Sequence, residues 1–291
     1  MNNPGGVQAS DESALWIENL VDGLSGITLK AKHAVCCEAS PFQKIEVFDT
    51  YTFGRVLLLG GTIVFTERDE HIYNEMITHP ALVTHPAPKT VCVIGGGDGG
   101  CLREVLKYPC VKKVSVVEID RQVTDVVKRF FPKLAKGFDD KRVDIAFKDG
   151  HEWLQANKQA FDIVLVDSYD PAGPVQSLET ANFLELVRNS LALGGIAVLL
   201  TDAPELNRDK IQRTVRDLTA HFAWRKPYVA TIPSFPLGTC SFVMCGTEVD
   251  GPGNPDASRL KAVARKCRYF CADIMQGAFC LPKTAAEIFN L

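Results

Sequence analysis

From Thr90 onward, short and fully apolar runs alternate with amphipathic segments, and this alternation limits the folds open to the chain. Strands buried on both faces read as continuous apolar runs, and they occur in parallel sheets that helices cover on both sides. The pattern therefore predicts a doubly wound α/β sheet. We expect its strands at 91–94, 113–117, 143–147, 162–166 and 195–201, with a late pair at 224–228 and 241–245.

The chain before this region has a different pattern. Between Thr28 and Phe65 the apolar residues alternate or form short β-branched runs at 43–48, 55–59 and 62–65, which predicts a small antiparallel sheet. Helical spacing follows over 67–84, and a Pro-rich linker over 85–88. We expect an N-terminal β-strand domain over 1–66 and a Rossmann-like catalytic domain over 67–291, with one final helix after the loop at 250–255.

Charge and hydrophobicity exclude several classes of protein. The 291 residues carry a formal net charge of −3 without a basic run, so no nucleic-acid partner is expected. The longest apolar runs have the length of strands, so no membrane span is expected either. The polar N-terminus does not resemble a secretory signal, and we expect a cytoplasmic protein.

The ten cysteines are scattered along a large chain, which argues against a disulfide framework. Two cysteine pairs lack a matching second pair or nearby histidines: Cys36 with Cys37, and Cys267 with Cys271. His71 and His79 share one predicted helix, but they are not at ligand spacing, and we expect them at the surface or at an interface. These patterns predict no metal site.

Acidic residues lie at the ends of four successive predicted strands. They are Asp98, Glu118, Asp149 and Asp167. In an open parallel sheet, ligands bind beyond the carboxyl ends of the strands. One such carboxylate is a common helix cap or turn residue, whereas four in succession indicate a binding site.

The first of these strands runs into a glycine-rich loop over residues 95–100. Glycines allow a ligand to approach the backbone, and Glu118 after the next strand can accept hydrogen bonds from both hydroxyls of a ribose. Together they predict an adenosine-type ligand. Gly95, Gly97 and Gly100 also fit the pattern GxGxxG, so an NAD-dependent dehydrogenase is one alternative.

Asp98 inside the loop distinguishes between these ligands by its charge. Two unit charges about 4 Å apart at an effective dielectric near 20 interact by roughly 4 kcal/mol, so a pyrophosphate is disfavoured. Intact S-adenosylmethionine carries a carboxylate near this loop, whereas its decarboxylated form keeps only positive groups there. Asp98 therefore favours the decarboxylated form, although an Asp98 that only caps the next helix fits either ligand.

In order and spacing, these motifs resemble the spermidine synthase family over about residues 28–245, and residues 279–282 are similar to its C-terminal segment. The resemblance implies a methyltransferase-type Rossmann-like fold and an aminopropyltransferase of polyamine biosynthesis. Such an enzyme moves the aminopropyl group of decarboxylated S-adenosylmethionine to putrescine or a similar diamine and releases 5′-methylthioadenosine. It further implies a homodimer and no cofactor beyond that co-substrate. The motifs that carry the resemblance are 66–70 with Tyr73 and Glu75, 93–100 with 102–105, 117–120, 149–150 and 167–174.

The resemblance also implies roles for individual residues. Donor-binding positions are Gln43, Gly95, Gly97, Asp98, Glu118, Asp149, Gly150 and Pro174, with Asp98 on the aminopropyl amine. Acceptor-side positions are Tyr73, Asn74, Asp98, Asp167, Asp170 and Phe235. Asp167 would be the proton acceptor, Asp170 would bind the far ammonium of the diamine, and Tyr73 would line the channel.

The chemistry itself also requires a base. An alkyl amine with a pKa near 10.4 arrives protonated, and it cannot attack the carbon beside a sulfonium until the proton is removed. Asp167 can attract the cation, accept its proton and orient the nitrogen lone pair. The neutral thioether product then leaves without acid assistance.

Four positions depart from the family pattern and leave the acceptor open. They are Gly60, Val64, Asn74 and Phe235, in place of the usual Asp, Gln, Gln or His, and Tyr. The expected pocket is less polar, because each lost hydrogen bond removes roughly 0.5–1.5 kcal/mol of orienting interaction. A longer or less polar amine is the alternative acceptor. A diamine N-methyltransferase and a catalytically weak regulatory paralogue remain alternative functions.

Overall fold

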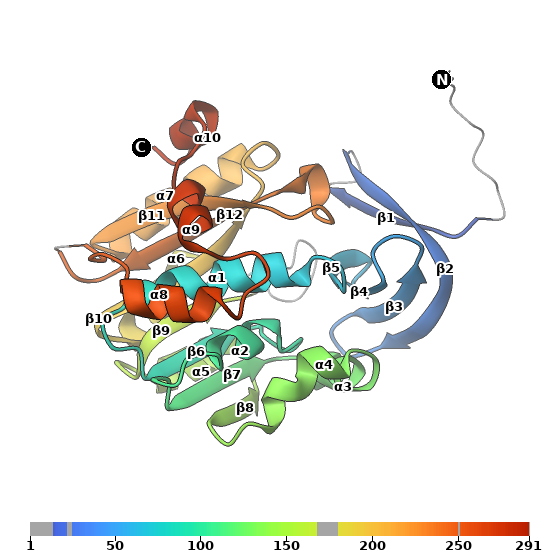
Figure 1. The fold of residues 1–291 in the computed structure, drawn as a ribbon, viewed down its shortest axis with the longest axis horizontal. Helices are drawn as coiled ribbons and strands as arrows, with labels where there is room; N and C mark the ends of the chain where they lie inside the picture. The colour runs from blue at the N-terminus through green and yellow to red at the C-terminus, as the bar shows by residue number, and fades with distance from the viewer. Residues whose placement is uncertain (1–13, 22–24, 168–179, 250, 291) are drawn as a thin grey trace.

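The computed structural model describes residues 14–21, 25–167, 180–249 and 251–290. Within them lie two sheets, a smaller one formed by the N-terminal residues and a larger one formed by the rest (Figure 1). Among the described residues no helix has the length and apolar character needed to cross a membrane.

The N-terminal sheet is an antiparallel meander of five strands, as the alternating pattern predicts. A tight turn at Gly60 and Gly61, with φ values of 58° and 86°, connects the last two strands, and glycine adopts this left-handed conformation without strain. The first strand was not expected, because Glu18 and Asn19 interrupt its apolar pattern. The strands are β1 (Trp16–Val21), β2 (Ser25–Ala39), β3 (Lys44–Thr50), β4 (Arg55–Leu59) and β5 (Thr62–Thr66).

The larger sheet has seven strands in the order β11-β12-β10-β9-β6-β7-β8. The five strands from β10 to β8 are mutually parallel, and β12 runs antiparallel to both of its neighbours. All seven strands expected in this region are present. Their bounds are β6 (Thr90–Ile94), β7 (Lys113–Glu118), β8 (Val143–Phe147), β9 (Phe161–Val166), β10 (Leu191–Asp202), β11 (Trp224–Thr231) and β12 (Thr239–Gly246).

Helices cover both faces of the larger sheet, which confirms the doubly wound architecture. One face packs on α1, α2, α8 and α9, and the other on α5, α6, α7 and α10. The helices are α1 (Glu70–Thr84), α2 (Gly100–Val105), α3 (Arg121–Phe130), α4 (Pro132–Ala135), α5 (Gly150–Ala156), α6 (Ala181–Ser190), α7 (Arg208–His221), α8 (Ala257–Ala264), α9 (Ala272–Ala278) and α10 (Lys283–Ile288), with short 3-10 turns η1 (Lys136–Asp139) and η3 (Pro236–Gly238).

A separate apolar cluster joins the two sheets. Ile45, Val47 and Leu57 of the N-terminal sheet pack against Val127 of α3 and Leu134 of α4. These side chains are at most 5% exposed, so the cluster excludes water and holds the small sheet against α3 and α4, the helices that follow β7 of the large sheet. The small sheet therefore lies beside the carboxyl ends of the parallel strands (Figure 1).

The C-terminal segment differs from the expectation of a single final helix, because it forms three short helices. Glu75 of α1 explains the break between α8 and α9. Its carboxylate accepts hydrogen bonds from the backbone N–H groups of Arg268, Tyr269 and Phe270 at 2.7–2.8 Å. Those three N–H groups are turned toward α1, so the chain cannot continue as a helix there.

His79 also differs from its expected position at the surface or an interface, because it is fully buried on α1. Its ring nitrogens lie 2.9 Å from the Tyr108 hydroxyl and 2.9 Å from a Glu104 carboxylate oxygen. Burial lowers the pKa of His79, so the ring is neutral at pH 7. Sequence spacing missed this placement because both partners lie on later elements.

We predict that Glu75→Ala lowers the free energy of unfolding by on the order of 2–4 kcal/mol, because three N–H groups lose a buried charged acceptor. Glu75→Gln, which keeps one acceptor oxygen, should cost less. Urea unfolding followed by circular dichroism measures both changes.

The matched control is Glu287→Ala on the exposed side of α10, which should change stability by less than about 0.5 kcal/mol. Equal unfolding midpoints for Glu75→Ala and Glu287→Ala would contradict the role given to Glu75.

Candidate active site

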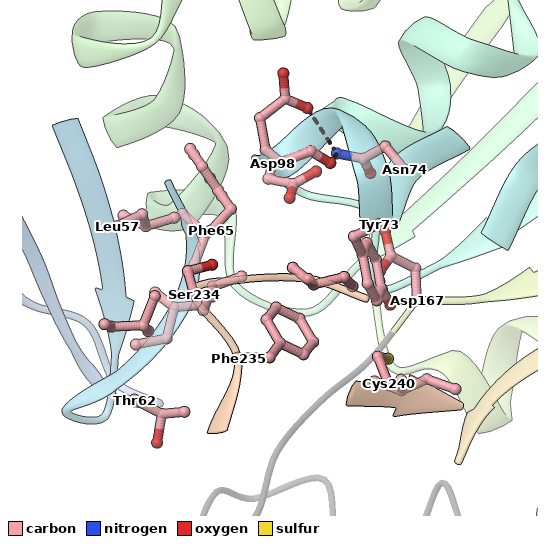
Figure 2. Close-up of a pocket in the computed structure, with 18 of the residues that line it drawn as sticks. Leu57, Thr62, Phe65, Tyr73, Asn74, Asp98, Asp167, Ser234, Phe235 and Cys240 are labelled. Atoms are coloured by element: carbon pink, nitrogen blue, oxygen red, sulfur yellow. Dashed lines mark hydrogen bonds between the residues drawn. The ribbon is translucent and has the colours of Figure 1, made fainter. Parts of the chain in front are cut away.

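A cavity lies at the carboxyl ends of β6, β7 and β9. The N-terminal sheet forms one wall through Leu57 and Phe65, and the β11–β12 connection forms another through Ser234 and Phe235 (Figure 2). Asp167 lies deep in the cavity beside Tyr73. The strand ends predicted to carry a binding site therefore converge on one enclosed space.

The glycine-rich loop brings backbone close to two of the polar side chains. A Cβ on Gly97 would lie 2.5 Å from Glu118 Oε2, and a Cβ on Gly100 would lie 2.2 Å from the amide nitrogen of Asn74. Gly99, which precedes α2, has a φ of 81°. Only glycine fits these positions, because a larger residue would displace Glu118 or Asn74. Of the predicted loop glycines, Gly95 lines the cavity and Gly97 lies behind Glu118.

Glu118 at the end of β7 is only 7% exposed. Its two carboxylate oxygens accept the N–H groups of Gly97 at 3.1 Å and Asp120 at 2.8 Å. Burial nevertheless raises the pKa of Glu118 to about 8, so these two bonds do not compensate the lost hydration. Further hydrogen-bond donors from a ligand would stabilise the charged form.

Three other predicted donor-side residues line the same side of the cavity: Gln43, Asp149 and Gly150. Asp149 caps α5 and accepts the N–H groups of His151 and Glu152. Gln43 donates to Asp120, 3.3 Å away. Pro174, the remaining predicted donor-side residue, lies outside the described residues.

Asp98, in the loop after β6, and Asp167, directly after β9, both line the cavity and are half-buried. Burial, followed by the charge of Asp167, raises the pKa of Asp98 to about 7. Burial also raises the pKa of Asp167, against the hydrogen bonds from Cys101 and Tyr73. The Tyr73 hydroxyl donates to Asp167 at 2.7 Å. A cationic ligand would stabilise both carboxylates in their charged form.

Asn74 is oriented by a neighbour that the sequence analysis did not single out. Its amide nitrogen donates to the carbonyl and to the carboxylate of Glu70, both at 2.9 Å, and the latter bond is drawn in Figure 2. Arg103 holds that carboxylate through two further bonds of 2.7 and 2.8 Å. The side-chain oxygen of Asn74 is buried without a hydrogen-bond partner among the described residues. It packs against Gly100, so a ligand would reach it only after a small movement of the side chain.

The opposite end of the cavity is largely apolar. Phe235 packs against Tyr73 with ring centres 5.8 Å apart, and Cys240 lies near them (Figure 2). Val64 also lines the cavity. Gly60, one of the four positions that depart from the family pattern, lies in the exposed β4–β5 turn and does not line the cavity. Its φ of 58° helps to close this tight turn, which places it at the tip of the two strands.

Asp69 positions the wall that contains Phe235, a role that the sequence motifs did not indicate. It is 3% exposed and accepts hydrogen bonds from the Thr66 hydroxyl and from both the N–H and the hydroxyl of Ser234. These bonds tie the β11–β12 connection to the start of α1. They use both carboxylate oxygens of Asp69, so this residue holds the wall in position rather than binding a ligand. Asp170, the predicted second acceptor carboxylate, lies outside the described residues.

Two family models match the chain. The Spermidine synthase tetramerisation domain matches residues 15–67, and the Spermine/spermidine synthase domain matches residues 70–252. A polyamine aminopropyltransferase of Thermoanaerobacter sp. (strain X514) is 38% identical over 95% of this chain and 99% of its own length. That of Bacillus subtilis (strain 168) is 37% identical over 96% of this chain and 100% of its own.

Solved structures are similar over nearly the whole chain. A spermidine synthase in complex with the transition state analogue AdoDATO has a TM-score of 0.91 at 28% identity and covers 98% of this chain and 97% of its own. The spermidine synthase of Thermotoga maritima has a TM-score of 0.89 at 28% identity and covers 95% and 94%. On these matches and on the geometry of the cavity, the chain belongs to the spermine/spermidine synthase family.

Proposed function

We propose that the chain transfers the aminopropyl group of decarboxylated S-adenosylmethionine to a diamine, putrescine first among them. The family and its named relatives support aminopropyl transfer. The observation that carries the choice of ligands is the pair Asp98 and Asp167, two half-buried carboxylates in one cavity whose pKa values burial raises. Two cationic substrates supply the positive charge that this pair needs.

In the proposed donor site, Glu118 accepts the ribose hydroxyls, and Gln43, Asp149, Gly150 and Pro174 hold the rest of the nucleoside. Asp98 binds the amine of the aminopropyl group. Asn74 supports this placement, because it lines the same cavity and its side-chain oxygen has no hydrogen-bond partner among the described residues. Oxygen acceptors of this kind suit an ammonium, which donates up to three hydrogen bonds and accepts none.

In the proposed reaction, the attacking amine gives its proton to Asp167. The freed nitrogen lone pair then forms a bond to the carbon beside the sulfonium as the carbon–sulfur bond breaks, and 5′-methylthioadenosine leaves with that electron pair. The raised pKa of Asp167 favours proton acceptance, and the Tyr73 hydroxyl orients the carboxylate. The reaction needs no metal and no further cofactor.

The proposed acceptor site extends from Asp167 past Tyr73 and Phe235, and the family resemblance assigns its second carboxylate to Asp170. Putrescine suits a site with a carboxylate at each end. The apolar wall of Val64, Phe235 and Cys240 supports a longer or less polar amine as the second candidate acceptor.

Two alternatives differ in testable ways. A diamine N-methyltransferase would need to bind intact S-adenosylmethionine, whose carboxylate would lie against Asp98. A regulatory paralogue would not need the hydrogen bond between Tyr73 and Asp167, which the chain retains. Both observations favour the aminopropyltransferase.

We further propose a homodimer in the cytosol. Trp16 and Leu20 on the N-terminal sheet are 45% and 42% exposed, which supports a subunit contact there. All ten cysteines are free thiols, which suits a reducing compartment.

We predict that the protein binds decarboxylated S-adenosylmethionine at least tenfold more tightly than the intact form, because only the latter places a carboxylate near Asp98. Asp98→Asn should remove most of this preference. Calorimetric titration of both ligands measures it, and Asp144→Asn on the exposed side of β8 controls for the change in net charge.

The same titrations have an expected pH dependence. Protonation of Asp98 below its pKa of about 7 removes the charge that attracts the donor, so affinity should fall about tenfold per pH unit below pH 7. Asp98→Asn should make this dependence shallower, and the part that remains should come from Glu118, whose pKa burial raises to about 8. If the unmutated protein binds intact S-adenosylmethionine as well as the decarboxylated form, and mass spectrometry finds a methylated diamine, the methyltransferase replaces the proposal.

A second prediction concerns the base. Asp167→Asn should lower kcat by a factor of about 10² or more while the Kd of the donor changes little, because the shape stays and the proton acceptor is lost. Single-turnover assays with calorimetry separate the two effects. Near-normal turnover at neutral pH would exclude Asp167 as the base.

A third prediction concerns the acceptor wall. Phe235→Tyr should lower the KM for putrescine several-fold by restoring a hydrogen-bonding hydroxyl, whereas Phe53→Tyr outside the cavity should not. Initial rates with amines from diaminopropane to spermidine measure the effect. An unchanged KM for putrescine together with good activity on a longer amine would reassign the acceptor.

A further inference from the structure

A second cluster of reactive side chains lies on the side of α1 that packs against the C-terminal segment. His79 of α1, Glu104 of α2 and Cys267, between α8 and α9, each direct one ligand atom to the same point. His79 Nε2 lies 2.9 Å from Glu104 Oε2 and 3.1 Å from Cys267 Sγ. All three atoms lie within 4.8 Å of one another. A tetrahedral metal ion needs this kind of convergence of nitrogen, oxygen and sulfur.

Two of the three side chains are held by further partners. The Tyr108 hydroxyl contacts the other ring nitrogen of His79 at 2.9 Å, and Arg103 donates to the other carboxylate oxygen of Glu104 at 2.8 Å. In the metal-free protein the Nε2–H of the neutral ring donates to the Glu104 carboxylate, and the Tyr108 hydroxyl donates to Nδ1. Metal binding would move the ring proton to Nδ1, where the Tyr108 oxygen can accept it, and Nε2 would then present its lone pair to the metal. Such outer partners orient metal-binding residues in proteins generally.

The cluster already attracts a positive charge from the protein itself. The Lys107 ammonium forms a close ion pair with Glu104, and it lies 3.9 Å from Cys267 Sγ and 4.0 Å from a Glu75 oxygen. The Lys107 side chain is 17% exposed, so it has a route to solvent. A divalent ion that displaces it would bring twice the charge to the same two carboxylates.

We propose that His79, Glu104 and Cys267 form a zinc-binding site that fastens the C-terminal segment to α1 and α2. Imidazole, thiolate and carboxylate together suit zinc, whereas magnesium and calcium prefer oxygen ligands alone. On binding, the Cys267 thiol loses its proton to solvent, a zinc–sulfur bond forms and Lys107 moves out. Water fills the fourth position. The site is separate from the catalytic cavity and from the function proposed for it.

Cobalt(II) is the probe, because it substitutes for zinc and absorbs light. Titration of the chelator-treated full chain should give a thiolate-to-cobalt charge-transfer band that saturates at one equivalent, and zinc should displace it. Zinc should also raise the melting temperature of the protein, since it binds only the folded state.

Three variants make the test specific. Cys267→Ser should lose the charge-transfer band and weaken zinc binding at least tenfold, whereas Cys271→Ser, a similarly half-buried cysteine at the start of α9, should keep both. Lys107→Met should tighten zinc binding at least tenfold, because the competing ammonium is gone. Aminopropyl transfer by Cys267→Ser should stay normal, so failure of the zinc site and failure of the proposed function are distinguishable.

The absence of a charge-transfer band in both the unmutated protein and Lys107→Met would overturn the proposal. A band of equal strength in Cys267→Ser would overturn it as well, because the thiolate would then come from another cysteine.

Discussion

Buried negative charge is the constraint on which the rest of the structure depends. Parallel strands bring Glu118, Asp167 and the Asp98 loop to one edge of the sheet, and the N-terminal sheet keeps water away from them. For Asp98, whose pKa rises from 3.8 to about 7, the folded chain without ligand binds more protons than the unfolded chain between those values. Its contribution to stability therefore falls as pH rises through that window, and a cationic ligand reverses the loss.

Backbone N–H groups hold Glu118 and Asp98 in place, whereas side chains hold Asp167. Gly97 and Gly100 leave room for Glu118 and Asn74 at distances that no other residue allows, and backbone N–H groups bind Glu118 and Asp98. The glycine-rich loop therefore positions both Glu118 and Asn74. Among the described residues that hydrogen-bond to Glu118 there is no lysine or arginine. Its negative charge is therefore stabilised only by the N–H groups of Gly97 and Asp120.

Much of this arrangement could be predicted from the sequence, because apolar runs, alternation and strand-end carboxylates are local patterns. The seven strands of the large sheet and the cavity position of Asp167 followed from them. What failed depends on distant contacts. Glu75 breaks the C-terminal helix from 193–195 residues away, and the partners that bury His79 lie 25, 29 and 188 residues along the chain. No spacing rule connects such positions before the fold is known.

The two ends of the cavity are built by different means. The donor end depends on backbone and on carboxylates at strand ends, where a change in one residue disturbs its neighbours. The wall at Val64, Phe235 and Cys240 is made of side chains on β5, the β11–β12 connection and β12, and Asp69 anchors that connection from outside the wall. If this wall contacts the amine, as proposed, descendants of one ancestral enzyme could diverge in their choice of amine by exchanging a few wall residues, while the chemistry they inherit stays intact.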